Sequence, residues 1–169
     1  SASGVNLKKF DISQKTLWRE EIRGKCAIPS DAVVFGFVGR ITRDKGINEL
    51  LSAFKTVLAE LPNSYLLIVG NTEITPAVDM SLYQWAQENP HSVFCGSTNV
   101  VEQYLSAMDA YILPSYREGF GMVVVEAEAM GVPVIVTDIP GPTDAMLPDE
   151  TGLLVKKADV DSLVAAMSE

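Results

Sequence analysis

The chain has 169 residues, of which 47% are hydrophobic, and its 13 basic and 22 acidic side chains give a formal net charge of −9. This length and apolar fraction suffice for one domain with a hydrophobic core, and they exclude a disordered polypeptide. The two cysteines, Cys26 and Cys95, form no CxxC motif, so we expect reduced, mostly buried thiols in a cytoplasmic protein. The acidic balance argues against nucleic acid or an anionic membrane surface as a partner.

Strand-like and helix-like patterns alternate along the chain. The apolar run at 33–38 ends at a glycine, which is typical of a buried parallel strand, whereas residues 47–61 place apolar side chains at helical spacing. Strands are expected at 33–38, 65–69, 93–94, 110–113, 133–136 and 152–155, and helices at 47–61, 80–88, 100–108, 122–130 and 160–167. This alternation predicts an α/β fold, a Rossmann-like parallel sheet with helices on both faces.

A cationic loop follows the first expected strand. It is bounded by Gly39 and Gly46 and contains Arg40, Arg43 and Lys45. Ligands of open α/β sheets bind outside the carboxyl ends of the strands, where an arginine fork and a lysine charge can grip two phosphates. A solvated polar turn is an equally good interpretation of the spacing alone. The loop contains neither a G-x-G-x-x-G fingerprint nor a P-loop, which disfavours a nicotinamide enzyme or an ATPase.

A second loop follows the fourth expected strand and runs into a helix. Gly119 and Gly121 allow the backbone to approach a ligand, and the amide groups at the helix start suit a diphosphate. Glu118 and Glu126 lie on either side of that helix start and suit sugar hydroxyl groups. Glu126 interrupts an apolar stretch and is expected to need a partner, whereas Glu128 is expected to be exposed.

Other polar positions carry weaker signals. Asp138, in the stiff loop 137–144, is either a ligand group or, more commonly, a cap of its own turn. His91 is the only histidine, and its turn context favours an exposed loop residue over a catalytic base. The acidic residues are scattered without histidine partners, so no metal site is expected, and no stretch is apolar enough for a membrane span.

Five segments, in order over essentially the whole chain, resemble motifs of the glycosyltransferase group 1 domain (family GT4). Residues 39–46 resemble its G-R-[LI]-x-x-x-K-G signature, and 118–126 resemble its E-x7-E motif in the E-G-F-G form. Residues 126–136 resemble the E-A-x-A-x-G-x-P-V-[IV] continuation. Residues 151–155 resemble N-G-x-L-V with Thr in place of Asn, and 3–10 resemble the segment where the linker enters the second domain.

The resemblance implies the C-terminal, donor-binding half of a GT-B enzyme. Residues 1–169 would form one nucleotide-sugar-binding domain, with 1–12 as a remnant of the linker and the N-terminal acceptor domain missing. The family transfers a sugar from a nucleoside diphosphate donor, such as a UDP- or GDP-sugar, with retention of configuration and without a metal or other cofactor. The resemblance is to the bacterial capsule and lipopolysaccharide branch, whose acceptors are lipid-linked sugars. The whole enzyme would be cytoplasmic or peripheral at the inner membrane, and this part alone inactive.

The resemblance also implies roles for individual residues. Arg40 and Lys45 would hold the donor diphosphate and stabilise the departing nucleotide, and Glu118 would contact the sugar hydroxyls. Glu126 would take the ribose hydroxyls. The remaining donor-binding positions are Gly39, Asn71, Gly96, Thr98, Gly119, Phe120, Gly121 and Met122.

Two alternatives share the expected fold. One is a non-catalytic nucleotide-binding or scaffolding module, against which the intact glutamates and loop cations argue. The other is a sugar-nucleotide epimerase or NAD enzyme, which would need the glycine fingerprint that this chain lacks.

Overall fold

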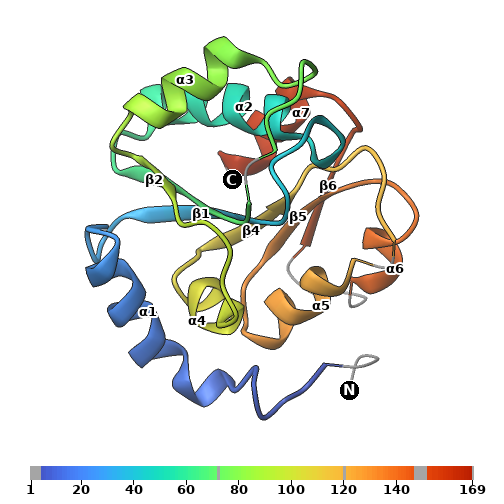
Figure 1. Cartoon of the computed structure of the whole chain (residues 1–169). Helices are drawn as coiled ribbons and strands as arrows, with labels where there is room; N and C mark the ends of the chain where they lie inside the picture. Colours follow the sequence, from blue (N-terminus) through green and yellow to red (C-terminus); the bar gives the residue numbers. More distant parts are fainter. Residues whose placement is uncertain (1–4, 72, 120, 147–151, 169) are drawn as a thin grey trace.

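Six parallel strands form one sheet in the order β3-β2-β1-β4-β5-β6 (Figure 1). The computed structural model describes residues 5–71, 73–119, 121–146 and 152–168. The strands are β1 (Val33–Val38), β2 (Ser64–Val69), β3 (Ser92–Phe94), β4 (Ala110–Leu113), β5 (Val134–Thr137) and β6 (Gly152–Val155). All six strands expected from the sequence are present, within one residue at each end, and every pairing is parallel.

Helices cover both faces of the sheet, as expected. One face carries α2 (Ile47–Glu60), α3 (Met80–Glu88) and α7 (Val160–Met167), and the other carries α1 (Lys15–Lys25), α4 (Val101–Ser106), α5 (Met122–Ala129) and α6 (Pro142–Ala145) (Figure 1). Alternate residues of β1 and β2 enter the two core clusters, with Val34 and Leu67 on the α1 side and Phe35 and Leu66 on the α2 side. Because both faces are buried, these strands are continuously apolar in the sequence.

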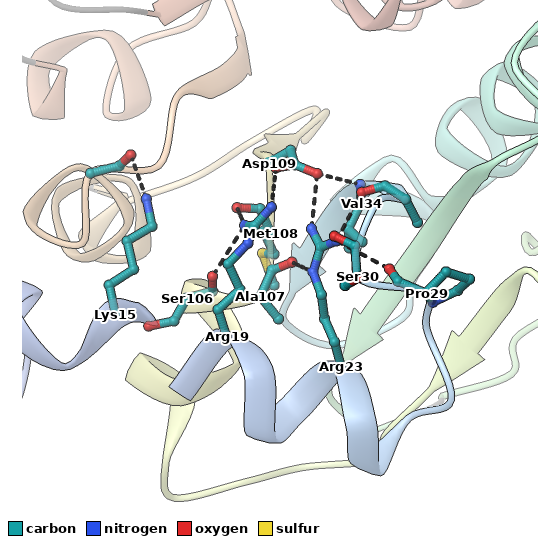
Figure 2. A network of polar contacts seen from close by, with 12 residues as sticks. Lys15, Arg19, Arg23, Pro29, Ser30, Val34, Ser106, Ala107, Met108 and Asp109 are labelled. Atoms are coloured by element: carbon teal, nitrogen blue, oxygen red, sulfur yellow. Dashed lines mark hydrogen bonds and ion pairs between the residues drawn. The ribbon is translucent and has the colours of Figure 1, made fainter. Parts of the chain in front are cut away.

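The helix α1 was not predicted, because its apolar stripe is narrow: Trp18 and Ile22 pack on the core, while Leu17 is 52% exposed. Arg23 is buried beside them. The helix is also attached by polar contacts to the segment that precedes β4 (Figure 2). Arg19 donates to Asp109 Oδ1 at 2.7 Å, and Arg23 donates to Asp109 Oδ2 at 2.9 Å. Hydrophobic periodicity cannot detect a helix that is held in this way.

Arg23 is the centre of this network. It is 3% exposed, and besides Asp109 its guanidinium donates to the carbonyl oxygens of Ala107 at 3.1 Å and Ala32 at 2.8 Å. Burial by itself would raise the pKa of Asp109, but the hydrogen bonds from Arg19 and from the Val34 amide, with the charges of both arginines, lower that pKa below its ordinary value.

We expect Asp109→Ala to destabilise the domain by about 3 kcal/mol at neutral pH, because it leaves the buried Arg23 charge without its counter-ion. Urea unfolding checks this value, with Asp31→Ala, which removes an exposed carboxylate, as the control. Since folding lowers the Asp109 pKa, its contribution is complete above the unfolded value of 3.8 and is lost as the pH falls through the lower folded value. The difference between wild type and variant should therefore shrink in acid. A constant difference down to pH 2 would contradict this assignment.

The segment 142–145 and the two cysteines also differ from the sequence expectation. Residues 142–145 form the short helix α6, with Pro142 in its first turn, where a stiff irregular turn was expected. Cys26 and Cys95 are free thiols, as expected, but each is half-buried rather than mostly buried. Interaction with the Cys95 thiol, assisted by the charge of Lys25 and opposed by burial, lowers the pKa of Cys26 to about 7.

Candidate functional site

The two loops singled out in the sequence meet where the winding of the sheet reverses. β1 pairs with β2 on one side and with β4 on the other. The chain leaves β1 towards α2 on one face, and it leaves β4 towards α5 on the opposite face (Figure 1). Adjacent parallel strands whose connections diverge in this way leave a crevice at their carboxyl ends, where α/β proteins bind ligands. Residues 39–46, 114–119 and 121 therefore lie beside that crevice.

The two loops are packed backbone against backbone. Gly46 has φ +80°, and a Cβ atom there would lie 2.0 Å from the carbonyl oxygen of Pro114. The amide of Tyr116 donates to the carbonyl oxygen of Asp44 at 2.8 Å. The glycine that closes the cationic loop is therefore required by the approach of the second loop.

Lys45 and Glu118 are brought into direct contact by this packing. The Lys45 ammonium donates to Glu118 Oε2, and the hydroxyl of Ser115 donates to the same oxygen at 2.7 Å. The two charged side chains are 25% and 12% exposed, respectively, so solvent screens them incompletely. The structure thus places a cation and a carboxylate, which are far apart in the sequence, at one point of the crevice.

Arg40 lies between two cavities. Its side chain is 65% exposed and forms an ion pair with Glu73, at 3.6 Å between Nη1 and Oε2. One cavity, of about 420 Å³, includes Arg40, Lys45 and Glu118 in its lining. The other, of about 260 Å³, lies over the ends of β1 and β2 and is lined by Gly39, Arg40, Gly70, Asn71, Ser97 and Thr98, among others. A ligand spanning both cavities would pass Arg40.

The resemblance implies that the nucleobase would lie near Asn71 and the turn at 95–98, and of these positions Asn71 and Thr98 line the smaller cavity directly. Gly96 is exposed next to it, and its carbonyl oxygen accepts the amide of Gly70 at 2.8 Å. Ser97, which belongs to the same expected turn at 95–98, lines this cavity too.

The helix α5 begins beside the larger cavity. Gly119 lines that cavity, Gly121 is the N-cap residue of the helix with φ +83°, and Met122 is its first residue. Phe120, which was also expected at the site, lies outside the described residues. The neighbouring turn packs closely, since a Cβ at Gly141 would lie 1.7 Å from the Gly119 carbonyl oxygen.

Glu126 is half-buried on α5. Burial raises its pKa, which the charge of Lys9 opposes and that of Glu102 reinforces. The carboxylate of Glu126 forms no side-chain hydrogen bond with any described residue. The close partner that the sequence led us to expect is therefore not found among those residues. Glu128 is half-buried too, which corrects the expectation that it is exposed.

Tyr111 and Ser115 contribute to the site and were missed. The Tyr111 hydroxyl is completely buried without a hydrogen-bond partner among the described residues, and burial together with the charges of Glu118 and Glu126 raises its pKa. It therefore lies near both glutamates. The place of Tyr111 in a strand made it appear to be a core residue. Ser115 lies two residues after the end of β4, a position that could have identified it.

Asp138 and His91 do not take part in this cluster. Asp138 is exposed, and the cap expected of it is supplied by Asp144, whose carboxylate accepts the Gly141 amide at 3.3 Å. His91 lies before β3, at the opposite end of the sheet, where its ring stacks on Tyr65 with centroids 4.1 Å apart. It is no catalytic base of this site, as expected, although it is half-buried rather than exposed.

The described residues contain neither a group of side chains suited to a metal ion nor a helix suited to crossing a membrane. In residues 5–71, 73–119, 121–146 and 152–168, no three His, Cys, Asp or Glu side chains are grouped so that they could hold a metal ion. No helix in the same ranges is long and apolar enough to cross a bilayer.

Comparison with known proteins shows that this chain is similar to glycosyltransferases. The profile of the family described as "Glycosyl transferases group 1" matches residues 18–169. The capsular polysaccharide biosynthesis glycosyltransferase CapM of Staphylococcus aureus is 36% identical over 163 residues, covering 96% of this chain and 42% of CapM. A UDP-Gal:alpha-D-GlcNAc-diphosphoundecaprenol alpha-1,3-galactosyltransferase of Escherichia coli is 28% identical, over 98% of this chain and 43% of its own length.

A solved structure shares the fold. Alr3699/HepE of Anabaena, crystallised in complex with UDP, superposes with a TM-score of 0.80 at 21% identity, over 94% of this chain and 44% of HepE. The chain spans about two fifths of the length of each of these relatives. Because the family profile covers nearly the whole sequence, from α1 to the C-terminus, the chain belongs to the glycosyl transferase group 1 family.

Proposed function

We propose that this chain is the donor-binding half of a GT-B glycosyltransferase that transfers a sugar from a nucleoside diphosphate donor. The observation that carries the proposal is the contact between Lys45 and Glu118 at the reversal point of the sheet, with Arg40 beside it. The relatives support it, since the galactosyltransferase is named for a UDP-sugar donor and HepE binds UDP.

In the proposed complex the diphosphate lies over the larger cavity. Lys45 and Arg40 neutralise its charge and stabilise the nucleotide as it leaves, assisted by the amide groups at the start of α5. These groups supply positive charge to the diphosphate without a metal ion. Glu118 accepts hydrogen bonds from hydroxyls of the donor sugar, while Gly119 and Gly121 allow the backbone to approach closely.

The nucleoside occupies the smaller cavity. Asn71 and Thr98 line it and offer polar groups to the base, with Gly96 next to them. Glu126 takes the ribose hydroxyls, and a half-buried carboxylate without a close partner among the described residues has capacity for such hydrogen bonds. Met122, and Phe120 outside the described residues, complete the donor site that we propose.

The remainder of the enzyme supplies most of the acceptor site. We infer retention of anomeric configuration, a lipid-linked saccharide acceptor and a role in cell-surface polysaccharide synthesis, which the names of CapM and of the galactosyltransferase support. The missing part is an N-terminal domain facing this one across the cleft. We place the whole enzyme in the cytoplasm or at the cytoplasmic face of the membrane.

Titration of the 169-residue chain with UDP, GDP and ADP tests the proposal. We expect weak binding of at least one, with amide NMR shifts at 39–46 and 96–98, and weaker binding of its monophosphate, which lacks one phosphate for Lys45 and Arg40. We also expect no sugar transfer by the chain alone. Failure of all three nucleotides to bind, or robust transfer by this chain, would overturn the proposal.

A further inference from the structure

Tyr116 connects four segments of the chain beside the proposed donor site. Its hydroxyl donates to Glu49 Oε2 on α2, and its amide donates to the Asp44 carbonyl oxygen at 2.8 Å. The Arg43 guanidinium lies over its ring, 4.9 Å from the centroid, and the Lys157 ammonium, from the turn after β6, lies 5.9 Å from it. Such cation–ring contacts are attractive, so this side chain is held from several directions.

The bond from Tyr116 to Glu49 runs alongside the contact between Lys45 and Glu118. Glu49 lies one helical turn after Lys45, and Tyr116 lies two residues before Glu118. The pair Lys45–Glu118 thus joins the second loop to the cationic loop at the cavity, and the pair Tyr116–Glu49 joins it to the first turn of α2. The Tyr116 amide bond to Asp44 and an exposed ion pair, Arg117 to Asp44 at 3.0 Å, add further links, of which the ion pair is the weaker.

The carboxylate of Glu49 is only partly satisfied by hydrogen bonds among the described residues. Its Oε1 atom is buried and has no hydrogen-bond partner among the described residues. Its other carboxylate oxygen, Oε2, accepts the hydrogen bond from the Tyr116 hydroxyl. Burial and this hydrogen bond raise the pKa of Tyr116 to about 12, so the hydroxyl remains protonated and able to donate at neutral pH. A buried carboxylate is tolerated when its remaining hydrogen bond is strong and well placed.

We propose that Tyr116 is a positioning residue, whose hydroxyl bond to Glu49 fixes the 114–119 loop against the 40–46 loop so that Lys45 and Glu118 reach the diphosphate end of the donor together. This inference rests on the proposed function. It assigns a role to a residue between strand β4 and Glu118 that does not itself line either of the two cavities. Loss of the hydroxyl should therefore weaken recognition of the diphosphate more than recognition of the nucleoside.

The test measures Kd for the nucleoside diphosphate that wild type binds most tightly among UDP, GDP and ADP, and for its monophosphate. Tyr116→Phe is expected to weaken diphosphate binding about five-fold and monophosphate binding less than two-fold. Glu49→Ala should reproduce this pattern, and the double variant should be no worse than either single one. Glu49→Gln, whose amide oxygen still accepts the bond, should remain close to wild type.

Tyr65→Phe is the matched control, because it removes a tyrosine hydroxyl at the opposite end of the sheet and should change neither Kd. Equal weakening of both nucleotides by Tyr116→Phe, or no weakening, would overturn the inference while leaving the proposed function intact. If Tyr116→Phe fails to fold, Glu49→Ala and Glu49→Gln decide it: equal Kd ratios in these two variants would overturn it. Absence of wild-type binding to all three nucleotides would remove the proposed function and this inference together.

Discussion

Lys45→Ala should lower sugar transfer by the full-length enzyme about 100-fold or more, with most of the loss in kcat. The ammonium lies at the crevice beside Glu118. In the proposed reaction, negative charge would develop there on the departing diphosphate as the sugar is transferred. A fixed charge in a partly buried site stabilises that developing charge more than it stabilises the bound donor. In the isolated chain the same substitution should weaken nucleoside diphosphate binding.

Arg40→Ala should also lower transfer, with a larger share of the loss in KM, because its side chain is 65% exposed and, in the proposed complex, would contribute to binding of the donor before the reaction. Lys55→Ala provides the matched control, since its ammonium lies on α2 over the ring of Trp85 at 5.4 Å. Steady-state kinetics of the three variants separate the effects. Transfer by Lys45→Ala at a rate close to wild type would take this residue out of the phosphate role.

Gly70→Ala should abolish nucleotide binding and destabilise the domain by more than about 2 kcal/mol. A Cβ at Gly70 would lie 1.7 Å from the carbonyl oxygen of Gly39, and the backbone φ of +145° is rare for a residue with a side chain. The neighbour is backbone, so the loops after β1 and β2 must separate, and these loops line the smaller cavity. Calorimetric titration and urea unfolding measure the two effects.

Two other glycines separate the causes of this loss. Gly96 has φ +69° but no atom within 4 Å of an added Cβ, so Gly96→Ala tests backbone strain without a clash. Gly24 has neither strain nor a near neighbour, so Gly24→Ala in α1 should be neutral or slightly stabilising. If Gly96→Ala loses as much binding as Gly70→Ala, strain and not the clash with Gly39 is responsible.

Prediction from the sequence succeeded where apolar burial dominates. The strands β1 and β2 are buried on both faces, so their apolar runs identified them, and α2 was identified by its apolar stripe. It failed at α1, which buries Ile22 and Arg23 and depends on Asp109, a residue of a distant segment. Contacts of this kind are set by three-dimensional partners, and a local pattern of side chains does not contain them.

The candidate site shows the same division. Arg40, Lys45 and Glu118 could be singled out because charges and glycines in a loop after a strand indicate a ligand site. Glu126 could be singled out because it interrupts an apolar stretch. Tyr116 was part of the same loop but received no role, since nothing local connects it to Glu49. Tyr111 was concealed by its strand, although its hydroxyl lies near both glutamates of the motif.

The sequence by itself determined the alternation of strands and helices, the loops that carry the cations and carboxylates, and the family. It also showed a net charge of −9, against which a phosphate ligand would need local cations. The tertiary structure pairs β1 with β4, strands from distant parts of the chain, and so brings Glu118 to the crevice where Lys45 and Arg40 lie. The physical reason is that strand order depends on how the two helical layers bury their apolar faces against the whole sheet. No single segment contains that information.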